Sequence, residues 1–399
     1  MIPATWTEKQ LGEICNIYTG NSINEQVKQK KYSNLSSGYN YIATKDIDFS
    51  SKIDYENGVK IPLKEPGFKI APKNSTLLCI EGGSAGRKIA FTSQDICFVN
   101  KLCAFVSNNN VLNEKFLFYF LQSPSFRRIF SNKVTGLIGG VSTSKLKSIS
   151  IVYPSLSEQQ RIVEKLDTLF ADIEKEKQIA QQNLQNAKDL FESELNKLFA
   201  ENTGWKHKKL SEVAIDFGRG KSKHRPRNDK CLYDGPYPFI QTGDIRNSKH
   251  YITSYTQTYN ETGLAQSKLW PKGTLCITIA ANIAETGILD FDACFPDSVI
   301  GCTFDNNKTN VCFVEYLLQS FKSVLQAKGK GIAQDNINLG TFENQFFPFP
   351  EKSVQDSIVQ RLDTLHEQTQ KLEQIYTQQI TDSDELKQAI LKKAFNGEL

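Results

Sequence analysis

The chain repeats itself at long range, and this repetition constrains its fold more than any other feature. The stretch IVEKLDTLF, which begins at Ile162, returns as IVQRLDTLH from Ile358. Other segments return in the same order: WTEKQLGEI from Trp6 as WKHKKLSEV from Trp205, YIATKDI from Tyr41 as FIQTGDI from Phe239, and FLFYFLQS from Phe116 as FVEYLLQS from Phe313. The offset between copies falls only from 199 to 196 residues along the chain. This period is too long for a solenoid and indicates duplication of a whole domain with an appendage.

Each copy begins with mixed, turn-rich sequence and ends with a helical segment. We predict a first globular domain over residues 1–154, a long helix over 155–201, a second globular domain over 202–350 and a second long helix over 351–399. A chain of 399 residues with 39% hydrophobic content can form two ordinary cores. The duplication therefore accounts for the full length.

The globular domains are predicted to mix short strands with a few helices. STLLCIE, KIAFTS, GTLCITIA and TGILDF are β-rich runs bounded by turn residues. VLNEKFLFYFLQSPSFRRIF and NVCFVEYLLQSFKSVLQA have helical periodicity. We therefore expect an α+β fold in each copy.

The two long helices carry apolar residues at alternating steps of four and three, which is typical of a coiled-coil seam. We expect the seam to run through Ile162, Leu166, Leu169, Ile173, Glu176, Ala180, Asn183, Ala187 and Leu190, and through Ile358, Leu362, Leu365, Thr369, Leu372, Tyr376, Gln379, Ser383, Leu386 and Ile390. Phe170 and Phe199 are expected on the outer faces. Because the chain crosses the second globular domain between the helices, we expect an antiparallel pair with the domains at its opposite ends.

Composition restricts the cellular setting. No apolar run is long enough to cross a bilayer, and the N-terminus MIPATWTEKQ lacks the layout of a signal peptide. Nine cysteines without a C-x-x-C pair argue against a disulfide framework and a zinc site. Cys79, Cys97, Cys276 and Cys294 lie among apolar residues and are expected to be buried thiols. We expect a cytoplasmic protein without a membrane partner.

Catalytic signatures are missing from the sequence. N-P-P-Y and D-P-P-Y, which would mark an amino-methyltransferase, do not occur, and Pro296–Asp297 is not followed by the remainder of a nuclease motif. The GKS of Gly220–Ser222 does not complete a phosphate loop, because the first glycine of that motif would fall at Ile215. Four scattered histidines provide no pair for a metal site. We expect neither a catalytic residue nor a metal ligand in this chain.

A basic segment begins the second copy. Residues 218–231, GRGKSKHRPRNDKC, hold six Lys or Arg and one Asp, with Gly and Pro that prevent a helix. An exposed basic loop that contacts nucleic acid is one interpretation. A solvated surface loop without a ligand is the other.

The arrangement resembles the specificity subunit of Type I restriction-modification enzymes. The resemblance covers essentially the whole chain and is carried by LGEI and LSEV near the domain starts, PFIQTGDI from Pro238, TIAANIAETGILDFDACFPDSVIG from Thr278, LSEQQRIVEKLDTLF from Leu156 and the final ILKKAFNGEL from Ile390. In that family each globular unit is a target recognition domain that reads one half of a split, asymmetric DNA sequence. The long helices form an antiparallel coiled-coil spacer that docks two methyltransferase subunits.

The resemblance implies partners rather than chemistry in this chain. It implies binding to double-stranded DNA, two methyltransferase subunits and the restriction and translocase subunits. S-adenosylmethionine, ATP and magnesium would belong to those partners, so no cofactor is expected here. The second copy, KSVQDSIVQ from Lys352, departs from the EQQRI wording of the first, which leaves open whether the two docking surfaces are equivalent.

Candidate DNA contacts come from the polar, turn-rich segments. Asn, Gln, Ser and Thr can read base edges, and Lys and Arg can hold phosphates. In the first copy the candidates are Thr44, Lys45, Ser84, Arg87, Lys88, Ser142 and Lys145. In the second copy they are Arg219, Lys221, Lys223, Arg225, Arg227, Thr242, Asp244, Arg246, Gln334 and Asn336. The alternative for each residue is an ordinary turn.

Two other functions remain open from sequence. One is a two-headed DNA-binding adapter that works without a methyltransferase. The other is the specificity subunit of a Type IIB-like system. A neighbouring methyltransferase gene would favour the Type I interpretation, and a helicase-nuclease gene would complete that set.

Overall fold

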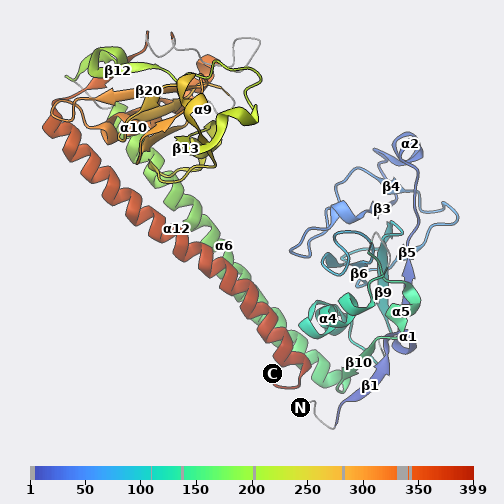
Figure 1. The fold of residues 1–399 in the computed structure, drawn as a ribbon. Coiled ribbons are helices and arrows are strands. Elements are labelled where there is room, and N and C mark those ends of the chain that lie inside the picture. Colours follow the sequence, from blue (N-terminus) through green and yellow to red (C-terminus); the bar gives the residue numbers. More distant parts are fainter. Residues whose placement is uncertain are drawn as a thin grey trace. The chain divides into compact units, whose positions relative to one another are not determined.

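The computed structural model describes residues 5–108, 110–135, 139–200, 204–280, 284–329, 340 and 344–399, with only the backbone described for 323–329. The chain divides into two compact units. The first unit contains residues 1–181 and 377–399, and the second contains residues 182–376. Each unit therefore combines one globular domain with one half of each long helix (Figure 1).

The first unit is built from short strands and mostly short helices. Its strands are β1 (Thr7–Gln10), β2 (Cys15–Thr19), β3 (Tyr39–Ile42), β4 (Lys60–Ile61), β5 (Ile70–Ala71), β6 (Thr76–Cys79), β7 (Ile89–Phe91), β8 (Ile96–Phe98), β9 (Leu102–Ser107) and β10 (Ser150–Tyr153). Its helices and helical turns are α1 (Leu11–Ile14), α2 (Glu25–Val27), η1 (Lys28–Tyr32), η2 (Thr44–Asp46), α3 (Glu114–Gln122), α4 (Pro124–Lys133) and α5 (Thr143–Lys147). The long helix α6 (Leu156–Ala200) begins in this unit.

The second unit repeats this order. Its strands are β11 (Lys206–Lys209), β12 (Ala214–Arg219), β13 (Tyr233–Phe239), β14 (Tyr251–Ile252), β15 (Gln257–Tyr259), β16 (Leu269–Trp270), β17 (Leu275–Thr278), β18 (Thr286–Leu289), β19 (Ala293–Cys294), β20 (Val299–Phe304) and β21 (Phe346–Phe349). Its helices and helical turns are α7 (Leu210–Val213), η3 (Lys230–Leu232), α8 (Thr242–Asn247), α9 (Glu261–Ala265) and α10 (Val311–Gly329). The long helix α12 (Lys352–Phe395) begins here.

The two globular domains share one sheet topology. In the first, the strand orders are β2-β9-β6-β7 and β4-β3-β8-β5, and β1 pairs with β10. In the second, they are β12-β20-β17-β18-β14 and β15-β13-β19-β16, and β11 pairs with β21. The order is the same except that β14 extends one edge. The predicted duplication of an α+β domain is confirmed.

A parallel strand pair forms the centre of the second sheet in each domain. Ile42 lies opposite Phe98 in β3 and β8, and Phe239 lies opposite Cys294 in β13 and β19.

The cysteines predicted to be buried, Cys79, Cys97, Cys276 and Cys294, are at most 1% exposed. These thiols therefore act as small apolar residues of the core.

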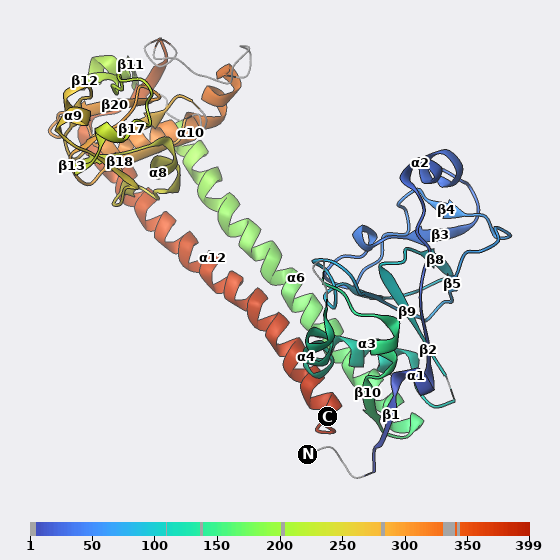
Figure 2. The ribbon, with the colours of Figure 1, turned by 45° about the vertical axis from the view of Figure 1, so that its right-hand side comes forward.

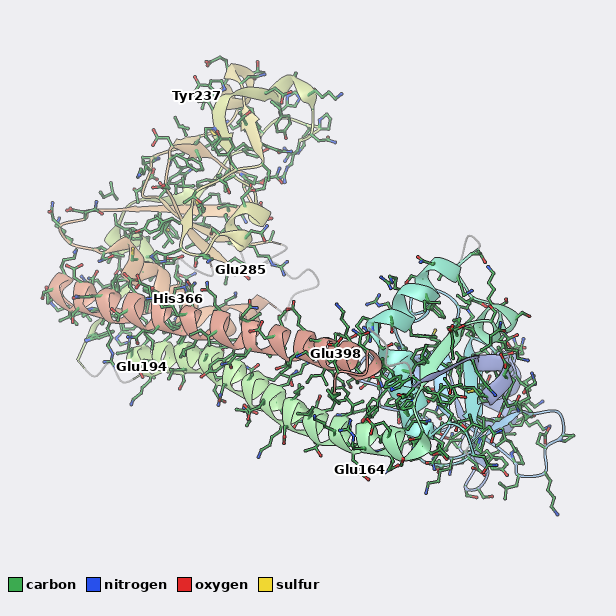
Figure 3. The ribbon with its side chains drawn as sticks, turned by 90° about the horizontal axis from the view of Figure 1, so that it is seen from below. Glu164, Glu194, Tyr237, Glu285, His366 and Glu398 are labelled. Atoms are coloured by element: carbon green, nitrogen blue, oxygen red, sulfur yellow. The ribbon has the colours of Figure 1, made fainter. Side chains whose placement is uncertain are left out.

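The long helices pair antiparallel within each unit (Figure 2). In the first unit, Lys177 Nζ lies 2.6 Å from Asp384 Oδ1, and the Phe395 ring packs 5.0 Å from that of Phe116 in α3. In the second unit, Glu194 of α6 forms an ion pair with Arg361 of α12. Glu194 on α6 and His366 on α12 are labelled in Figure 3. The His366 ring lies 4.9 Å from the ring of Phe191 on α6. The antiparallel pairing agrees with the sequence prediction.

The predicted outer positions of two aromatic residues are wrong. Phe170 is 9% exposed and packs against Tyr119, while Phe199 is 3% exposed and contacts Trp205 and Phe313. Phe170 lies where α6 packs on the first globular domain and Phe199 where it packs on the second, so a domain core covers each residue. Heptad reasoning placed them outside because it considered only the partner helix.

The predicted seam is also displaced in part. Glu176, Leu190, Leu372, Gln379 and Leu386 are exposed. The neighbouring residues turn inward instead, namely Lys177, Phe191, Glu373, Ile380 and Lys387, which are partly buried. In places, successive buried positions are four residues apart more than once in a row. This occurs because a straight helix has 3.6 residues per turn, so its buried face shifts gradually away from a strict 3.5-residue repeat. Several apolar side chains thus remain on the outer surface: Leu156, Ile179, Leu190, Val354, Leu372, Ile375 and Leu386.

A buried glutamine fixes the start of each long helix. Gln159 Oε1 accepts from the backbone N–H of Asn113 at 2.8 Å, and its Nε2 donates to the Pro154 carbonyl at 2.9 Å. Gln355 makes the same bonds with Asn310 and Pro350, each at 2.9 Å. An amide with partners on both its oxygen and nitrogen holds the helix to the preceding loop without leaving a buried polar group unpaired.

The helical segment that follows β9 in the first domain differs from the segment that follows β20 in the second. Pro124 begins α4 in the first unit, where Ser123 Oγ accepts from the Phe126 N–H at 3.2 Å. In the second unit, Phe321 occupies the position of Pro124, and α10 continues without interruption to Gly329. Proline at the first helical position ends the preceding helix because it has no N–H to donate.

Candidate nucleic-acid interface

The repeated T-x-D sequence after β3 and β13 forms a helix start in both domains. Asp46 Oδ2 accepts from the Ala43 N–H at 2.8 Å, and Asp244 Oδ2 accepts from the Gln241 N–H at 2.8 Å. The carboxylate satisfies a backbone donor at the first turn. Asp244, a predicted DNA contact, therefore has a structural role that orients Thr242 beside it.

An exposed aromatic residue gathers three predicted contacts in the first domain. Phe49 is 62% exposed, and Arg87 Cζ and Lys88 Nζ lie 5.0 and 5.3 Å from its ring centroid. Lys88 Nζ also donates to the Thr44 carbonyl at 2.9 Å. Two cations on one accessible ring form a surface that can hold phosphate and stack against a base.

Phe49 is absent from the sequence-based prediction because the short stretch DIDFSSK around it shows no helical or strand pattern that would single it out. An isolated apolar residue on a surface is ordinary, and only the structure shows the cations around it. Lys45 lies exposed on the helical turn η2, next to Thr44.

The loop after β6 is held by a tight turn. Ser84 O accepts from the Arg87 N–H at 3.0 Å, and Gly86 has a φ of 71°. A Cβ on Gly86 would lie 2.6 Å from the Phe130 ring, so a side chain there would displace the turn that presents Arg87.

Ser142 and Lys145 have partners within the domain. Ser142 Oγ caps α5 by accepting from the Lys145 N–H at 3.4 Å. Lys145 Nζ donates to Thr135 Oγ1 at 3.0 Å and to the Lys133 carbonyl at 3.3 Å. These bonds connect α5 to the end of α4.

The basic segment of the second domain folds against the protein surface. Arg225 Nη1 donates to the carbonyls of Ser222 and His224 at 2.7 and 2.8 Å. Arg227 Nη2 forms an ion pair with Asp297 and lies 2.8 Å from both of its carboxylate oxygens. A Cβ on Gly220 would lie 2.2 Å from the Phe295 carbonyl, so only glycine allows this close approach.

The cations of this segment therefore fall into two groups. Arg225 and Arg227 shape the loop. Arg219, Lys221 and Lys223 are exposed, and within the described parts of the chain no hydrogen bond or ion pair of the Lys221 or Lys223 side chain occurs. The ammonium groups of Lys221 and Lys223 are therefore accessible to an external anion.

A pocket of about 260 Å³ lies beside this loop. Its lining includes the predicted contacts Arg227 and Thr242 and three amide residues absent from the prediction, Asn228, Gln241 and Gln257. Gln241 Nε2 donates to Gln257 Oε1. The Gln257 NH₂ group and the Gln241 side-chain oxygen remain as a donor group and an acceptor, the two kinds of group that glutamine uses against adenine.

Aromatic side chains support this pocket. Phe239 and Tyr259 stack with centroids 4.0 Å apart, and Tyr233 lies 5.3 Å from Tyr259. The first domain has different chemistry at the matching turn, where Ala43 replaces Gln241. The two copies thus present unlike side chains on the same backbone arrangement.

Other predicted contacts lie apart from these clusters. Arg246 is exposed on α8 and lines a separate pocket of about 450 Å³ with Lys249 and Lys322. Gln334 and Asn336 lie outside the described residues. The predicted set is therefore not one continuous site.

Two globular domains of one topology, each followed by a long helix, show that the chain is a tandem duplication of one domain type. The chain belongs to the family of the Type I restriction modification DNA specificity domain, whose model matches residues 3–182 and again residues 202–382. The predicted family is confirmed.

Characterised relatives match along the whole chain. The Type I restriction enzyme StySPI specificity subunit of Salmonella potsdam is 22% identical over 100% of this chain and 90% of its own length. The EcoBI specificity subunit of Escherichia coli is 23% identical over 99% of this chain and 86% of its own length. The relatives are specificity subunits, so the family role is DNA recognition rather than catalysis.

Solved structures share the fold. A chain from the structure described as the structural basis underlying complex assembly and conformational transition of the type I R-M system has a TM-score of 0.82 at 20% identity, with 100% of both chains covered. The HsdS subunit from Thermoanaerobacter tengcongensis has a TM-score of 0.62 at 20% identity and covers 100% of this chain and 98% of its own. Within the described residues, no helix has both the length and the apolar character needed to span a bilayer.

Proposed function

We propose that each globular domain reads one half of a split, asymmetric DNA sequence. The observation that carries this proposal is the strand order that the two domains share, apart from the added edge strand β14, combined with different side chains at matching turns. One backbone arrangement used twice would approach two DNA segments in the same manner. Phe49 with Arg87 and Lys88 in one copy, and the amide pocket in the other, would select different bases.

The long helices are proposed to dock two methyltransferase subunits. Exposed apolar residues on both helices support this role, since such side chains on a paired helix favour a further protein contact. In the second unit a groove of about 580 Å³ is lined by Leu190, Leu365, Gln360 and Arg361. Restriction subunits would complete the assembly, and S-adenosylmethionine, ATP and magnesium would bind to these partners.

The two docking surfaces are proposed to differ in chemistry. In the first copy Arg161 pairs with Glu158 at 2.7 Å and donates to the Leu399 carbonyl at 2.8 Å. The matching positions in the second copy are Ser357 and Val354, and Val354 is 41% exposed. A charged contact on one helix thus corresponds to an apolar contact on the other.

Expression of this chain with the methyltransferase encoded beside it tests the proposal. Long-read methylation mapping should show a motif with two fixed half-sites and an unspecified gap. Exchange of residues 1–154 for those of a relative should change one half-site and preserve the gap. The chain alone should transfer no methyl group. A continuous motif, or methyl transfer by the chain alone, would contradict the proposal.

The alternatives are a DNA-binding adapter that needs no methyltransferase and the specificity subunit of a Type IIB-like system. Stable DNA binding without a partner would favour the adapter. Cleavage by a partner that fuses methyltransferase and nuclease would favour the second alternative.

A further inference from the structure

Three potential metal ligands lie together in the basic segment of the second domain. His224, Asp229 and Cys231 each offer one ligand atom, and these atoms lie within 4.8 Å of one another. His224 Nε2 is 3.1 Å from Asp229 Oδ2. Ligands of a tetrahedral zinc ion with bonds of about 2.0–2.3 Å are separated by about 3.3–3.7 Å. A small inward movement of the Cys231 side chain would therefore complete a three-ligand set.

The backbone that carries these side chains is fixed by groups outside the cluster. Gln266 Oε1 accepts from the backbone N–H groups of Lys223 and His224 at 2.6 and 3.0 Å. Asn260 Nδ2 donates to the Cys231 carbonyl at 3.0 Å. None of these bonds uses a ligand atom, so the loop can hold its shape while the imidazole, carboxylate and thiolate bind an ion.

Asp229 can act as a helix cap and as a ligand at the same time. Its Oδ1 accepts from the Cys231 N–H at 3.1 Å at the start of η3, whereas Oδ2 faces His224. Capping alone would explain one oxygen. It does not explain why an imidazole lies beside the other oxygen and a thiol lies within 4.8 Å of the same cluster.

Charge also favours a cation at this position. A carboxylate and a thiolate at this separation would repel each other as two negative charges. A divalent ion between the two groups would convert this repulsion into attraction to a shared cation. The ion with one carboxylate and one thiolate is neutral in sum, which suits a loop already rich in Lys and Arg.

The cluster is specific to the second copy. The corresponding stretch of the first domain, GNSINEQVKQKKY from Gly20 to Tyr32, has no His, Cys or Asp. The fold therefore does not require these three residues. Among the described residues, Cys231 is also the exposed cysteine, whereas Cys312 is half-buried and the others are buried.

We propose that His224, Asp229 and Cys231 bind a divalent transition metal of the zinc type, with a solvent molecule as fourth ligand. The ion stabilises the loop that presents Lys221 and Lys223. The purpose of this site rests on the proposed DNA-binding role. Its existence does not, because metal binding is measurable without DNA. In the sequence, His224, Asp229 and Cys231 form neither a histidine pair nor a C-x-x-C pair, so neither of these two patterns indicates the site.

Cobalt binding to the metal-free full-length chain tests the site. We expect about one equivalent to bind with a thiolate-to-cobalt charge-transfer absorption, and zinc to displace it. Cys231→Ala and His224→Ala should weaken binding by more than about 100-fold, because even loss of an outer partner costs about 10–100-fold. Cys312→Ala, which removes a thiol outside the cluster, should retain the absorption.

Trypsin cleavage gives a second measurement that does not depend on colour. Zinc should slow cleavage after the loop cations in the unmodified chain and should have no effect in Cys231→Ala. Circular dichroism of metal-free variants verifies that each remains folded. Absence of stoichiometric binding, or an absorption that persists in Cys231→Ala, would overturn the proposal, whether or not the chain reads a split DNA sequence.

Discussion

Tyr316 Oη donates a hydrogen bond of 2.6 Å to Asp363 Oδ1, and this bond joins α10 to α12 within the second unit. The first unit repeats it with Tyr119 and Asp167, which join α3 to α6. Both aspartates belong to the duplicated LDTL sequence, and both tyrosines belong to the duplicated FxxYxLQS sequence. The two long helices therefore share this sequence because each has to dock on the globular domain that precedes it.

Removal of this bond should destabilise the second unit. Tyr316→Phe leaves the Asp363 carboxylate without its buried donor, and hydrogen bonds to charged groups contribute about 1.5–3 kcal/mol. Urea unfolding in a Trp6→Phe background reports on Trp205 and Trp270, which both lie in the second unit. The free energy of unfolding should fall by that amount.

Tyr237→Phe is the matched control for this experiment. Tyr237 Oη donates to Glu261 Oε1 at 2.8 Å in an exposed pair, and the residue is labelled in Figure 3. Surface changes of this kind alter stability by about 0.5 kcal/mol or less. Equal losses in both variants would show that the bond between Tyr316 and Asp363 is not a special anchor.

A buried pair should make the second unit sensitive to alkaline pH. His250 contacts Glu315, which is fully buried. Burial lowers the pKa of His250, but hydrogen bonds with Cys312 and Glu315 raise it from 6.5 to about 10 overall. Because the folded-state pKa exceeds the unfolded value, the stabilisation is fully present below about pH 6.5 and is lost as pH rises through about 10.

Unfolding at a series of pH values tests this pair. In the Trp6→Phe background the urea midpoint should fall between pH 7 and 10, and the His250→Gln/Glu315→Gln variant should show a flatter profile. His250→Gln alone leaves a buried carboxylate without a cation and should cost about 3 kcal/mol. Profiles of equal slope in the parent and the double variant would contradict the role of the pair.

The basic loop should contribute to DNA binding mainly through two residues. Lys221 and Lys223 are exposed, whereas Arg225 and Arg227 bind protein groups. Each phosphate contact contributes a slope of about 0.9 to the dependence of log affinity on log salt. Lys221→Ala/Lys223→Ala in the methyltransferase complex should therefore reduce the slope by about two.

Lys392→Ala/Lys393→Ala removes the same charge from the end of α12 and is the control. Fluorescence anisotropy with duplex DNA at several salt concentrations measures both slopes. If the loop variant and the control have the same slope as the parent complex, the loop is only a solvated surface.

The amide pocket should determine part of the second half-site. Gln257→Ala removes one of the three amide residues that line the pocket together with Thr242. Loss of a bidentate base contact reduces discrimination by about 1–3 kcal/mol at one base pair. Methylation maps should show relaxed sequence at one position of the second half-site and an unchanged first half-site.

Gln378→Ala, an exposed amide on α12, is the control for this substitution and should leave the motif intact. A Gln257→Ala map identical to that of the parent would exclude the pocket from base reading. The first half-site is an internal control for folding of the complex.

The sequence predicted the architecture well because duplication and heptad spacing are repeated over long segments. It predicted the recognition residues less well because their roles depend on neighbours that lie far away in the chain. Asp244 and Thr242 read alike as polar loop residues, yet Asp244 caps a helix and Thr242 lines a pocket. The sequence around Phe49 does not indicate a binding site. Its role depends on Arg87, which is 38 positions later in the chain and lies over its ring in the structure.

The helical pair should set the gap between the two half-sites. Seven residues inserted into α6 between Gln181 and Gln182, together with seven in α12 between Tyr376 and Thr377, preserve a 3.5-residue seam. The insertion adds two turns to each helix and about 10.5 Å, which corresponds to about three base pairs at about 3.4 Å each. An insertion in α6 alone would displace buried Ala187 from its present environment and should impair assembly. Long-read methylation maps should show a gap longer by about three base pairs with both half-sites unchanged. An unchanged gap with full methylation, or a changed half-site, would show that the helices do not measure DNA.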